Sequence, residues 1–411
     1  MKRTIISGIY ISRHISLIIT LLLLFSFSWN GQKKMPDKDK SFAVAAYYTP
    51  RRGVTPDQLP LDQLTHIIYS FSRVREGEMK VHERAGEIIR GLVKQKENYP
   101  DLKVMVACGG WGADGFSDIA ETEESRKKFA ESAVRLVEEY QLDGIDMDWE
   151  YPGLEAGGIK YRPEDTQRFT LVMKALREHL DTLDREIIIT FAAAGWQRYY
   201  EHIETLEVMK YVDYINIMTY DQIGGNSDYT GHHTALGRIN MEDLEGYPLL
   251  AYMQSKKEDM ARMGYAFEPR STEKIVDYVI GLGVDPKKIL IGGAFYGRSW
   301  KGVPPDGNGL YQPNVKIHIG WCSYSRIRSE FENKNGFARY WDPIAKAPYL
   351  YNPADSIFMS YDDTLSVKLK TQYAIDKKLG GIMFWQLSDD TQEENSLLDA
   401  IDKAVQSEKI K

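Results

Sequence analysis

The chain has 411 residues, of which 43% are hydrophobic and 27% charged, a composition typical of a globular protein with enough apolar side chains for a large core. The net charge of −7, without a long basic run, argues against nucleic acid as the main partner and favours an uncharged substrate over an anionic one. Aromatic residues make up 12% of the chain, and both sugar-binding clefts and large cores use such rings.

The N-terminal segment has the pattern of an export signal. Lys2 and Arg3 precede the apolar run 15–27, which has the length of a signal-peptide core and is too short for a comfortable membrane span. A polar linker over residues 32–41 follows. We therefore expect a signal peptide over residues 1–31 and a secreted or periplasmic protein that has no membrane contact after cleavage. An uncleaved membrane anchor is the alternative.

Eight short apolar runs then alternate with longer amphipathic segments. Continuous apolar runs are typical of strands that are buried on both faces. The runs are residues 42–48, 66–71, 103–108, 144–149, 187–192, 214–219, 288–293 and 381–387, and clear helical patterns cover 124–140, 166–183 and 272–282. The repeated alternation of strand and helix predicts an α/β fold of the (β/α)8 or TIM-barrel type.

One interval interrupts this repeat, between the seventh and the eighth run. Residues 298–356 are rich in Gly, Pro, Tyr and Trp, and they predict a small α+β insertion domain, with the catalytic barrel over 42–297 and 357–405. Because loops at this end of a barrel carry function, the insertion should form one wall of a cleft. Cys108 and Cys322 lie in different settings, and we expect two separate core residues.

The fourth apolar run lies in the sequence LDGIDMDWEYP and carries three regularly spaced carboxyl groups. Because strand side chains alternate between faces, Asp146, Asp148 and Glu150 share one face and are about 6.6 Å apart. The opposite face carries Ile145, Met147 and Trp149. Burying three like charges is costly unless the groups share protons, so the pattern favours an acid–base site over a structural role.

Two other interpretations of this acidic run are a divalent-metal site and an exposed acidic strand edge. The apolar opposite face disfavours the exposed edge. No further His or carboxylate cluster supports a metal, and the pair His232 and His233 lacks the spacing of a metal motif, so we expect neither metal nor cofactor. Asp143 is out of phase with the other three carboxyls, and we expect a structural role for it at the start of the strand.

The run Asp143-x-x-Asp146-x-Asp148-x-Glu150 resembles the signature of the family-18 glycoside hydrolases, the chitinase family. The resemblance extends over residues 42–405, and residues 341–351 are similar to the insertion domain of the deep-cleft subfamily. Strand ends that resemble the family are Tyr47-Tyr48, Gly109-Gly110-Trp111, Met218-Thr219-Tyr220-Asp221, Phe295-Tyr296-Gly297-Arg298 and Phe384-Trp385.

The resemblance implies a chitinase that hydrolyses β-1,4-linked N-acetylglucosamine polymers or oligomers with retention of configuration. In this family the acetamido carbonyl of the substrate attacks its own anomeric carbon and forms an oxazolinium ion. By resemblance, Glu150 is the general acid and later the base. Asp148 would bind the acetamido N–H, and Asp146 would share a proton with Asp148. Tyr220 would donate a hydrogen bond to the acetamido oxygen.

The resemblance also implies a set of residues that bind the substrate. Trp385 would form the floor under the distorted sugar. Trp111 would stack on a neighbouring sugar, and the alternative for it is simple packing. Arg298 would contact sugar hydroxyls or a carboxylate, and the alternative for it is an ordinary salt bridge. The full set is Trp385, Asp221, Met218, Tyr47, Trp111, Arg298, Phe71 and Tyr151, with Tyr47 also expected to hydrogen-bond Asp146.

Two positions depart from the family pattern. Ala107 stands where the family usually has a Ser that supports the innermost Asp, so we expect Asp146 to be one hydrogen-bond donor short. Many deep-cleft members carry a Trp shortly after the position of Asp221, on the leaving-group side. This chain has Gln222-Ile223-Gly224-Gly225-Asn226-Ser227 there, which predicts weaker or differently shaped binding on that side.

Two other functions stay open beside the chitinase. One is an endo-β-N-acetylglucosaminidase that acts on N-glycans or peptidoglycan, and the other is a catalytically silent chitin-binding lectin. The insertion domain favours the chitinase because it deepens a cleft for one linear chain, and the presence of Glu150 argues against the lectin. The expected partners are therefore chitin or N-acetylglucosamine oligosaccharides, bound by a monomer.

Overall fold

The protein is described from a computed structural model, in which residues 42–50, 53–262 and 268–409 are described. The signal peptide and linker expected over residues 1–41 lie outside these ranges. Residues 41–411 form one compact unit. Within the described ranges, no helix combines the length and the apolar character that a membrane crossing requires.

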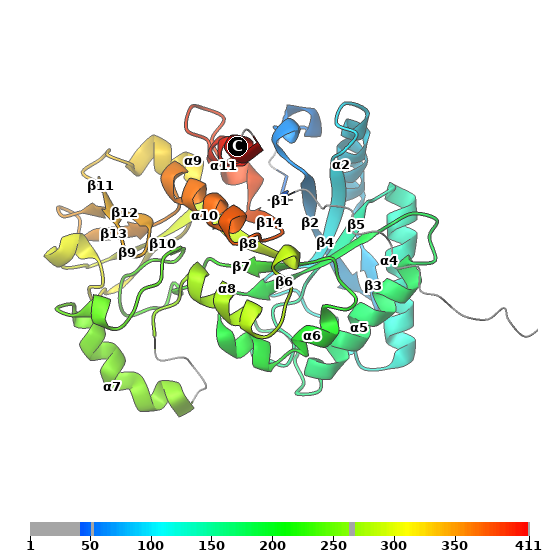
Figure 1. The fold of residues 1–411 in the computed structure, drawn as a ribbon, viewed down its shortest axis with the longest axis horizontal. Helices are drawn as coiled ribbons and strands as arrows, with labels where there is room; N and C mark the ends of the chain where they lie inside the picture. Colours follow the sequence, from blue (N-terminus) through cyan, green and yellow to red (C-terminus); the bar gives the residue numbers. More distant parts are fainter. Residues whose placement is uncertain (1–41, 51–52, 263–267, 410–411) are drawn as a thin grey trace, which may run out of the picture. The chain divides into compact units, whose positions relative to one another are not determined.

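Eight parallel strands close into a barrel (Figure 1). Around the barrel the order is β1-β2-β4-β5-β6-β7-β8-β14, and β14 pairs again with β1. Their bounds are β1 Ala43–Tyr48, β2 His66–Arg75, β4 Lys103–Gly109, β5 Gly144–Asp148, β6 Ile188–Ala194, β7 Tyr214–Met218, β8 Ile289–Ala294 and β14 Gly381–Trp385. All eight strands expected from the apolar runs are confirmed, and so is the (β/α)8 fold class. The short strand β3 (Glu78–Lys80) pairs antiparallel with the end of β2.

Helices surround the barrel, and the three with the clearest sequence pattern are confirmed as α4, α5 and α8. The helices are α2 Glu83–Lys94, α3 Phe116–Ile119, α4 Glu123–Tyr140, α5 Asp165–Leu180, α6 Thr205–Val208, α7 Pro248–Arg262, α8 Thr272–Gly281, α10 Thr364–Asp376 and α11 Leu397–Lys409. Short 3-10 turns are η1 Pro56–Gln58, η2 Leu61–Gln63, η3 Gln95–Glu97, η4 Gln197–Glu201, η5 Glu242–Leu244, η6 Pro286–Lys288, η7 Asp306–Gly309 and η9 Leu387–Asp389. Helix α4 begins after Thr122, whose side chain accepts a hydrogen bond from the backbone N–H of Ser125.

The residues of β5 alternate between two cores, as the sequence predicts. Ile145, Met147 and Trp149 are buried between the strands and the helices, where the Trp149 ring stacks on Phe116 with centroids 5.5 Å apart. Asp146 and Asp148 lie on the other face, toward the barrel interior. The apolar side chains of that interior include Ala45, Tyr47, Met105, Ala107, Leu290 and Met383.

The chain between β8 and β14 forms a second, antiparallel sheet with the order β10-β9-β13-β12-β11. The strands are β9 Tyr296–Lys301, β10 Lys316–Ser323, β11 Ala338–Asp342, β12 Ala347–Asn352 and β13 Ile357–Ser360, and β10 is followed by the short α9 (Tyr324–Arg326) and the π-helical η8 (Ile327–Phe331). The sheet therefore covers the interval 298–356 expected for the insertion and extends slightly beyond it, because β9 and β13 pair as far as Ser360.

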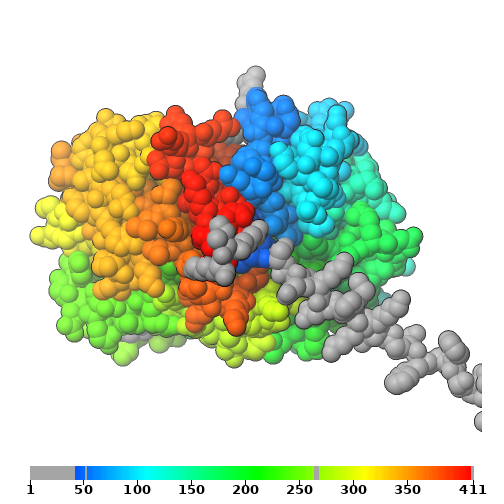
Figure 2. All heavy atoms as spheres, turned by 45° about the horizontal axis from the view of Figure 1, so that its top comes forward, coloured from blue at the N-terminus to red at the C-terminus, as the bar shows by residue number. Residues whose placement is uncertain are grey.

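The insertion has an apolar core of its own, which includes Trp300, Tyr351 and Phe358 together with Met253 of α7. Figure 1 shows α7 beside this sheet, and Figure 2 shows the C-terminal residues, in red, between the insertion, in orange, and the first strands of the barrel, in blue. Cys108 and Cys322 are both buried and unpaired with each other, as expected.

A buried ion pair fixes the point at which the insertion returns to the barrel. Lys370 Nζ of α10 lies 2.6 Å from Asp362 Oδ2, and both side chains are fully buried. The same carboxylate accepts hydrogen bonds from Thr234 Oγ1 and from the backbone N–H of Ala294, at the end of β8. This carboxylate therefore holds three segments that are far apart in the sequence.

We predict that Lys370→Met lowers the free energy of unfolding by about 3–5 kcal/mol, because it leaves a buried carboxylate without its counter-ion. Chemical denaturation of the two proteins measures the difference. Lys174→Met is the matched control, since Lys174 and its partner Glu178 are largely exposed on α5 and such a pair contributes about 0.5 kcal/mol or less. Equal stabilities of Lys370→Met and the wild type would contradict this role of the pair.

Candidate active site

Asp146 is the innermost of the three carboxyl groups on β5 and the residues that follow it, and it is completely buried. It accepts hydrogen bonds from Tyr47 Oη at 3.0 Å, from Thr190 Oγ1 at 2.5 Å and from Asn216 Nδ2 at 3.2 Å. The expectation that Ala107 leaves Asp146 short of a donor is therefore wrong. Ala107 lies opposite Asp146 in the sheet, but β6 and β7 supply donors from the other side.

Sequence reasoning missed Thr190 and Asn216, although both carry a detectable signal. Each is a polar residue inside an otherwise apolar strand, IITFAAA for β6 and YINIM for β7. Thr190 pairs directly with Asp146 in the sheet, so it occupies an inward position of its strand. A buried polar residue at an inward position of a neighbouring strand points to a partner in the barrel interior.

The three carboxyl groups differ in their expected protonation. Burial raises the pKa of Asp146 to about 6, although its three hydrogen bonds act in the opposite direction. Burial, followed by repulsion from Glu150 and Asp146, raises the pKa of Asp148 well above its usual value. Burial also raises the pKa of Glu150 to about 7, with a contribution from Asp221. The set therefore holds protons near neutral pH, as an acid–base catalyst requires.

One carboxyl oxygen of this set is available to a ligand. Asp148 Oδ1 is buried and has no hydrogen-bond partner among the described residues. Buried polar atoms nearly always have partners, so an unpartnered carboxyl oxygen beside two other acids indicates a place where a donor from a bound molecule belongs.

The end of β7 brings Met218, Tyr220 and Asp221 to the same mouth of the barrel. Tyr220 packs beside Tyr296, and its hydroxyl has only a weak contact, 3.9 Å, with Met383 Sδ. Burial, with repulsion from Asp148, raises the pKa of Tyr220 well above its usual value, so the hydroxyl keeps its proton and can donate.

Asp221 forms an ion pair with Arg298, whose Nε lies 2.7 Å from Asp221 Oδ1. Burial acts to raise the pKa of Asp221, but His233 and Arg298 hold it well below its usual value, so this group stays ionised. Arg298 also donates to the carbonyl of Gly320 in the insertion. The structure thus gives Arg298 a carboxylate partner within the protein.

An aromatic floor lies across the barrel mouth from Glu150. Phe71 stacks on the Trp385 ring with centroids 5.4 Å apart and an angle of 21° between planes, and Tyr47 lies 5.8 Å from the same ring. The strands β14 and β5 are four positions apart in both directions around the barrel, through β8, β7 and β6 or through β1, β2 and β4. Trp385 and the acids of β5 therefore face each other.

Three further aromatic rings line the ends of β4, β5 and β6. Trp111 is 65% exposed and meets Tyr151 edge to face at 6.4 Å, and Tyr151 meets Trp196 at 5.5 Å. Trp111 is therefore largely open to solvent at the barrel mouth, and its stacking on a sugar stays a prediction. Trp196, directly after β6, was not anticipated from the sequence, because a single Trp between two apolar segments carries no distinguishing pattern.

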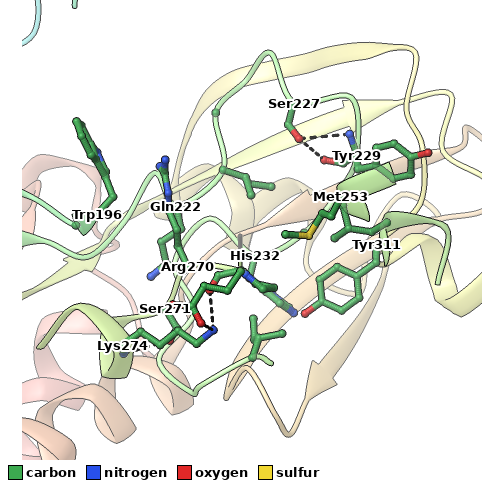
Figure 3. A pocket seen from close by; sticks show the side chains of 18 of the residues that line it. Trp196, Gln222, Ser227, Tyr229, His232, Met253, Arg270, Ser271, Lys274 and Tyr311 are labelled. Carbon is green, nitrogen blue, oxygen red and sulfur yellow. Dashed lines mark hydrogen bonds and ion pairs between the residues drawn. The ribbon is translucent and has the colours of Figure 1, made fainter. Parts of the chain in front are cut away.

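A hollow of about 590 Å³ lies beside this row, between the loop after β6, the loop after β7 and α7 (Figure 3). Trp196, Gln222 and Ile223 line it, together with Tyr229, Tyr252 and Tyr311. The acids of β5 are not part of its wall. The segment 222–227, which departs from the family pattern, therefore borders this hollow.

The two adjacent histidines lie in the loop after β7, and each is near a carboxylate. His232 Nε2 lies 3.0 Å from Asp342 Oδ2, which connects the loop after β7 to the insertion. His233 is fully buried, with Nδ1 at 3.6 Å from Asp221 Oδ1. In the described part of the chain, no group of three or more His, Cys, Asp or Glu side chains is arranged to hold a metal ion. Asp143 pairs with Lys96 at 2.7 Å, at the start of β5.

Comparison with known proteins identifies the family. The sequence profile of the glycosyl hydrolases family 18 matches residues 43–390. Chitinase A1 of Niallia circulans is 36% identical over 316 residues, which are 74% of this chain and 42% of that protein, so the chain spans less than half of this relative.

Two solved structures have the same fold over most of the chain. A glycoside hydrolase family 18 N-acetylglucosaminidase from Paenibacillus barengoltzii is 36% identical with a TM-score of 0.76, covering 89% of this chain and 100% of that one. Chitinase ChiA74 from Bacillus thuringiensis is 29% identical with a TM-score of 0.79, covering 89% of this chain and 70% of that one. The chain belongs to family 18 of the glycosyl hydrolases.

Proposed function

We propose that this protein is a chitinase, which hydrolyses β-1,4-linked N-acetylglucosamine polymers or oligomers with retention of configuration. The observation that carries the proposal is the row formed by Asp146 and Asp148 on the inward face of β5 and by Glu150 just after its end, with one oxygen of Asp148 that has no hydrogen-bond partner among the described residues. The names of the relatives support the same class of substrate.

Glu150 is the general acid in this proposal. Burial raises its pKa to about 7, so a large share of the side chain is protonated near neutral pH and can protonate the glycosidic oxygen. The C–O bond to the leaving sugar then breaks while the leaving oxygen takes the proton. Glu150 becomes a carboxylate, which serves as the base in the second half of the reaction.

The acetamido group of the substrate is the nucleophile. Its carbonyl oxygen bonds to the anomeric carbon, and the positive charge of the resulting oxazolinium ion lies next to Asp148. The free Oδ1 of Asp148 accepts the acetamido N–H, and Tyr220 donates to the acetamido oxygen. Because Asp146 is held by three donors, it can share one proton with Asp148 while the pair keeps a negative charge.

A water molecule completes the reaction. Glu150 removes a proton from the water, whose oxygen attacks the anomeric carbon and reopens the oxazolinium ring. The two inversions at this carbon give a product of the original configuration. Trp385, supported by Phe71, is the proposed floor that holds the apolar face of the sugar ring during both steps.

A second candidate differs in product rather than in chemistry. The relative from Paenibacillus barengoltzii, which the chain covers over its full length, is described as an N-acetylglucosaminidase. The same site would then release single N-acetylglucosamine units from a chain end. Glycan-cutting and purely sugar-binding functions fit less well, because the insertion adds a wall to the site and Glu150 is present.

We further propose that the protein is exported by its N-terminal segment and acts as a monomer outside the cytoplasm. The basic residues and the apolar run 15–27 support this proposal. The substrate class supports it too, because chitin is an extracellular polymer too large to enter a cell.

The proposed function predicts that the protein cleaves N-acetylglucosamine oligomers of four to six sugars. Mass spectrometry identifies the products, and a metal chelator should leave the rate unchanged, since no step of the proposed mechanism uses a metal ion. Release of disaccharides or longer fragments from the start would indicate a chitinase, whereas release of one sugar at a time, leaving an oligomer one unit shorter, would indicate the second candidate. No turnover of oligomers, with release of N-glycans from glycoproteins, would overturn both.

Substituting Glu150→Gln should lower the rate by at least about two orders of magnitude, because an amide cannot act as a general acid. The steady-state rate on the same oligomers measures the loss. Glu155→Gln is the matched control on the same loop, since Glu155 is exposed. A Glu150→Gln protein with wild-type activity would show that another group supplies the proton.

The pH profile should fall on the basic side with an apparent pKa near 7, because Glu150 acts only in its protonated form. Thr190→Val removes a hydrogen bond that lowers the pKa of Asp146. The Asp146–Asp148 pair would then lose its negative charge at a higher pH, so the acidic limb should move upward while the basic limb stays. Thr182→Val, at an exposed site, is the control. An unmoved acidic limb would contradict the role of this pair.

A further inference from the structure

Trp321 is an aromatic side chain of the insertion that faces the barrel mouth. It lies on β10 and is 40% exposed, whereas Trp300 of the same sheet is fully buried. One face of its ring stacks on Tyr296, with centroids 3.7 Å apart and an angle of 12° between planes. Since that face is covered, the exposed area belongs to the edge and the opposite face.

A hydrogen bond fixes the orientation of this ring. Trp321 Nε1 donates to Asp389 Oδ2 at 3.0 Å, and Asp389 is the last residue of η9, directly after β14. The ring is thus held by the insertion on one side and by the barrel on the other. A side chain that is fixed in this way loses little entropy when a ligand packs against it.

Trp321 also lies next to the proposed floor of the site. Its ring centroid is 6.4 Å from that of Trp385, and the two rings are nearly perpendicular, at 82°. The two tryptophans form a corner at the β8–β14 side of the barrel. Trp385 provides its base and Trp321 its wall.

The position of Glu150 determines which sugar of the substrate the Trp321 ring can contact. Glu150 lies two residues after the end of β5, which is across the barrel from β14, and in the proposed mechanism it protonates the oxygen that leaves with the departing sugars. The departing part of the chain therefore extends from Trp385 toward Glu150. The sugars on the other side of Trp385, toward Trp321, belong to the part that carries the reacting anomeric carbon.

We propose that Trp321 is a specificity-determining residue that binds the sugar ring next to the one over Trp385, on the side that keeps the anomeric carbon. This inference rests on the proposed function. Its physical basis is an exposed, preoriented aromatic face against the apolar C–H face of a pyranose ring. The protein thereby selects substrates that have at least two sugars on the side of the cleaved bond that carries the reacting anomeric carbon.

The test compares Trp321→Ala with the wild type on an aryl glycoside of the N-acetylglucosamine disaccharide, whose two sugars occupy the base and the wall of the corner. We expect KM to rise about tenfold with little change in kcat, since a stacking contact of about 1.4 kcal/mol that is present in both ground and transition state is lost. Trp321→Phe keeps a ring on Tyr296 and should restore KM to within about threefold.

Trp341→Ala is the matched control, a tryptophan-to-alanine change on β11 of the same insertion, where Trp341 packs against Arg339. Thermal unfolding of each variant checks that the fold is kept. If Trp321→Ala does not fold, Asp389→Ala is the second variant, because it frees the ring without removing it and should also raise KM. An unchanged or lower KM in whichever of the two variants folds would overturn the inference. A lower KM would indicate that the Trp321 ring obstructs the substrate.

The two proposals fail in different ways in this experiment. If the wild type does not turn over the aryl disaccharide or longer oligomers, the proposed function is wrong. If the wild type is active and Trp321→Ala equals it in KM, only the role of Trp321 is wrong.

Discussion

Three carboxyl groups, two on the inward face of the buried strand β5 and one just after its end, impose the constraint on which the rest of this site depends. Asp146, Asp148 and Glu150 cannot all be ionised in a barrel interior, because the cost of desolvation and mutual repulsion is too high. The structure resolves the conflict with three donors at Asp146 and with raised pKa values at all three acids. A row of acids that would destabilise an ordinary strand is thereby partly protonated near neutral pH and can act in acid–base catalysis.

The barrel gives the site two opposite sides, with the acids on one and aromatic rings on the other. Alternation along β5 sends the acids inward and packs Ile145, Met147 and Trp149 against the helices. Closure of the sheet then places β14, with Trp385, across from the acids, and the insertion adds Trp321 beside it. The Asp221–Arg298 ion pair connects the end of β7 to the insertion, so that the wall and the floor are parts of one connected structure.

The sequence predicted what depends on local pattern. Eight apolar runs were sufficient to predict the barrel. The two-residue spacing of the acids in and after β5 was sufficient to predict that they share one face. The donors Thr190 and Asn216 were missed because their value depends on the register between strands, which a single strand does not encode. Trp321 was missed for a similar reason, since only tertiary packing shows that a residue near position 320 meets Trp385 and Asp389. The prediction from Ala107 was wrong because other strands supply the hydrogen-bond donors to Asp146 that a Ser at position 107 would have supplemented.

The central claim is that cleavage proceeds by two successive displacements at the anomeric carbon, with Glu150 first as the acid and then as the base that activates water. The most direct measurement is the anomeric configuration of the first product, followed by proton NMR within seconds of mixing enzyme and oligomer. The account predicts the β-anomer initially, followed by slow mutarotation. An initial α-anomer would mean direct attack by water and would contradict it.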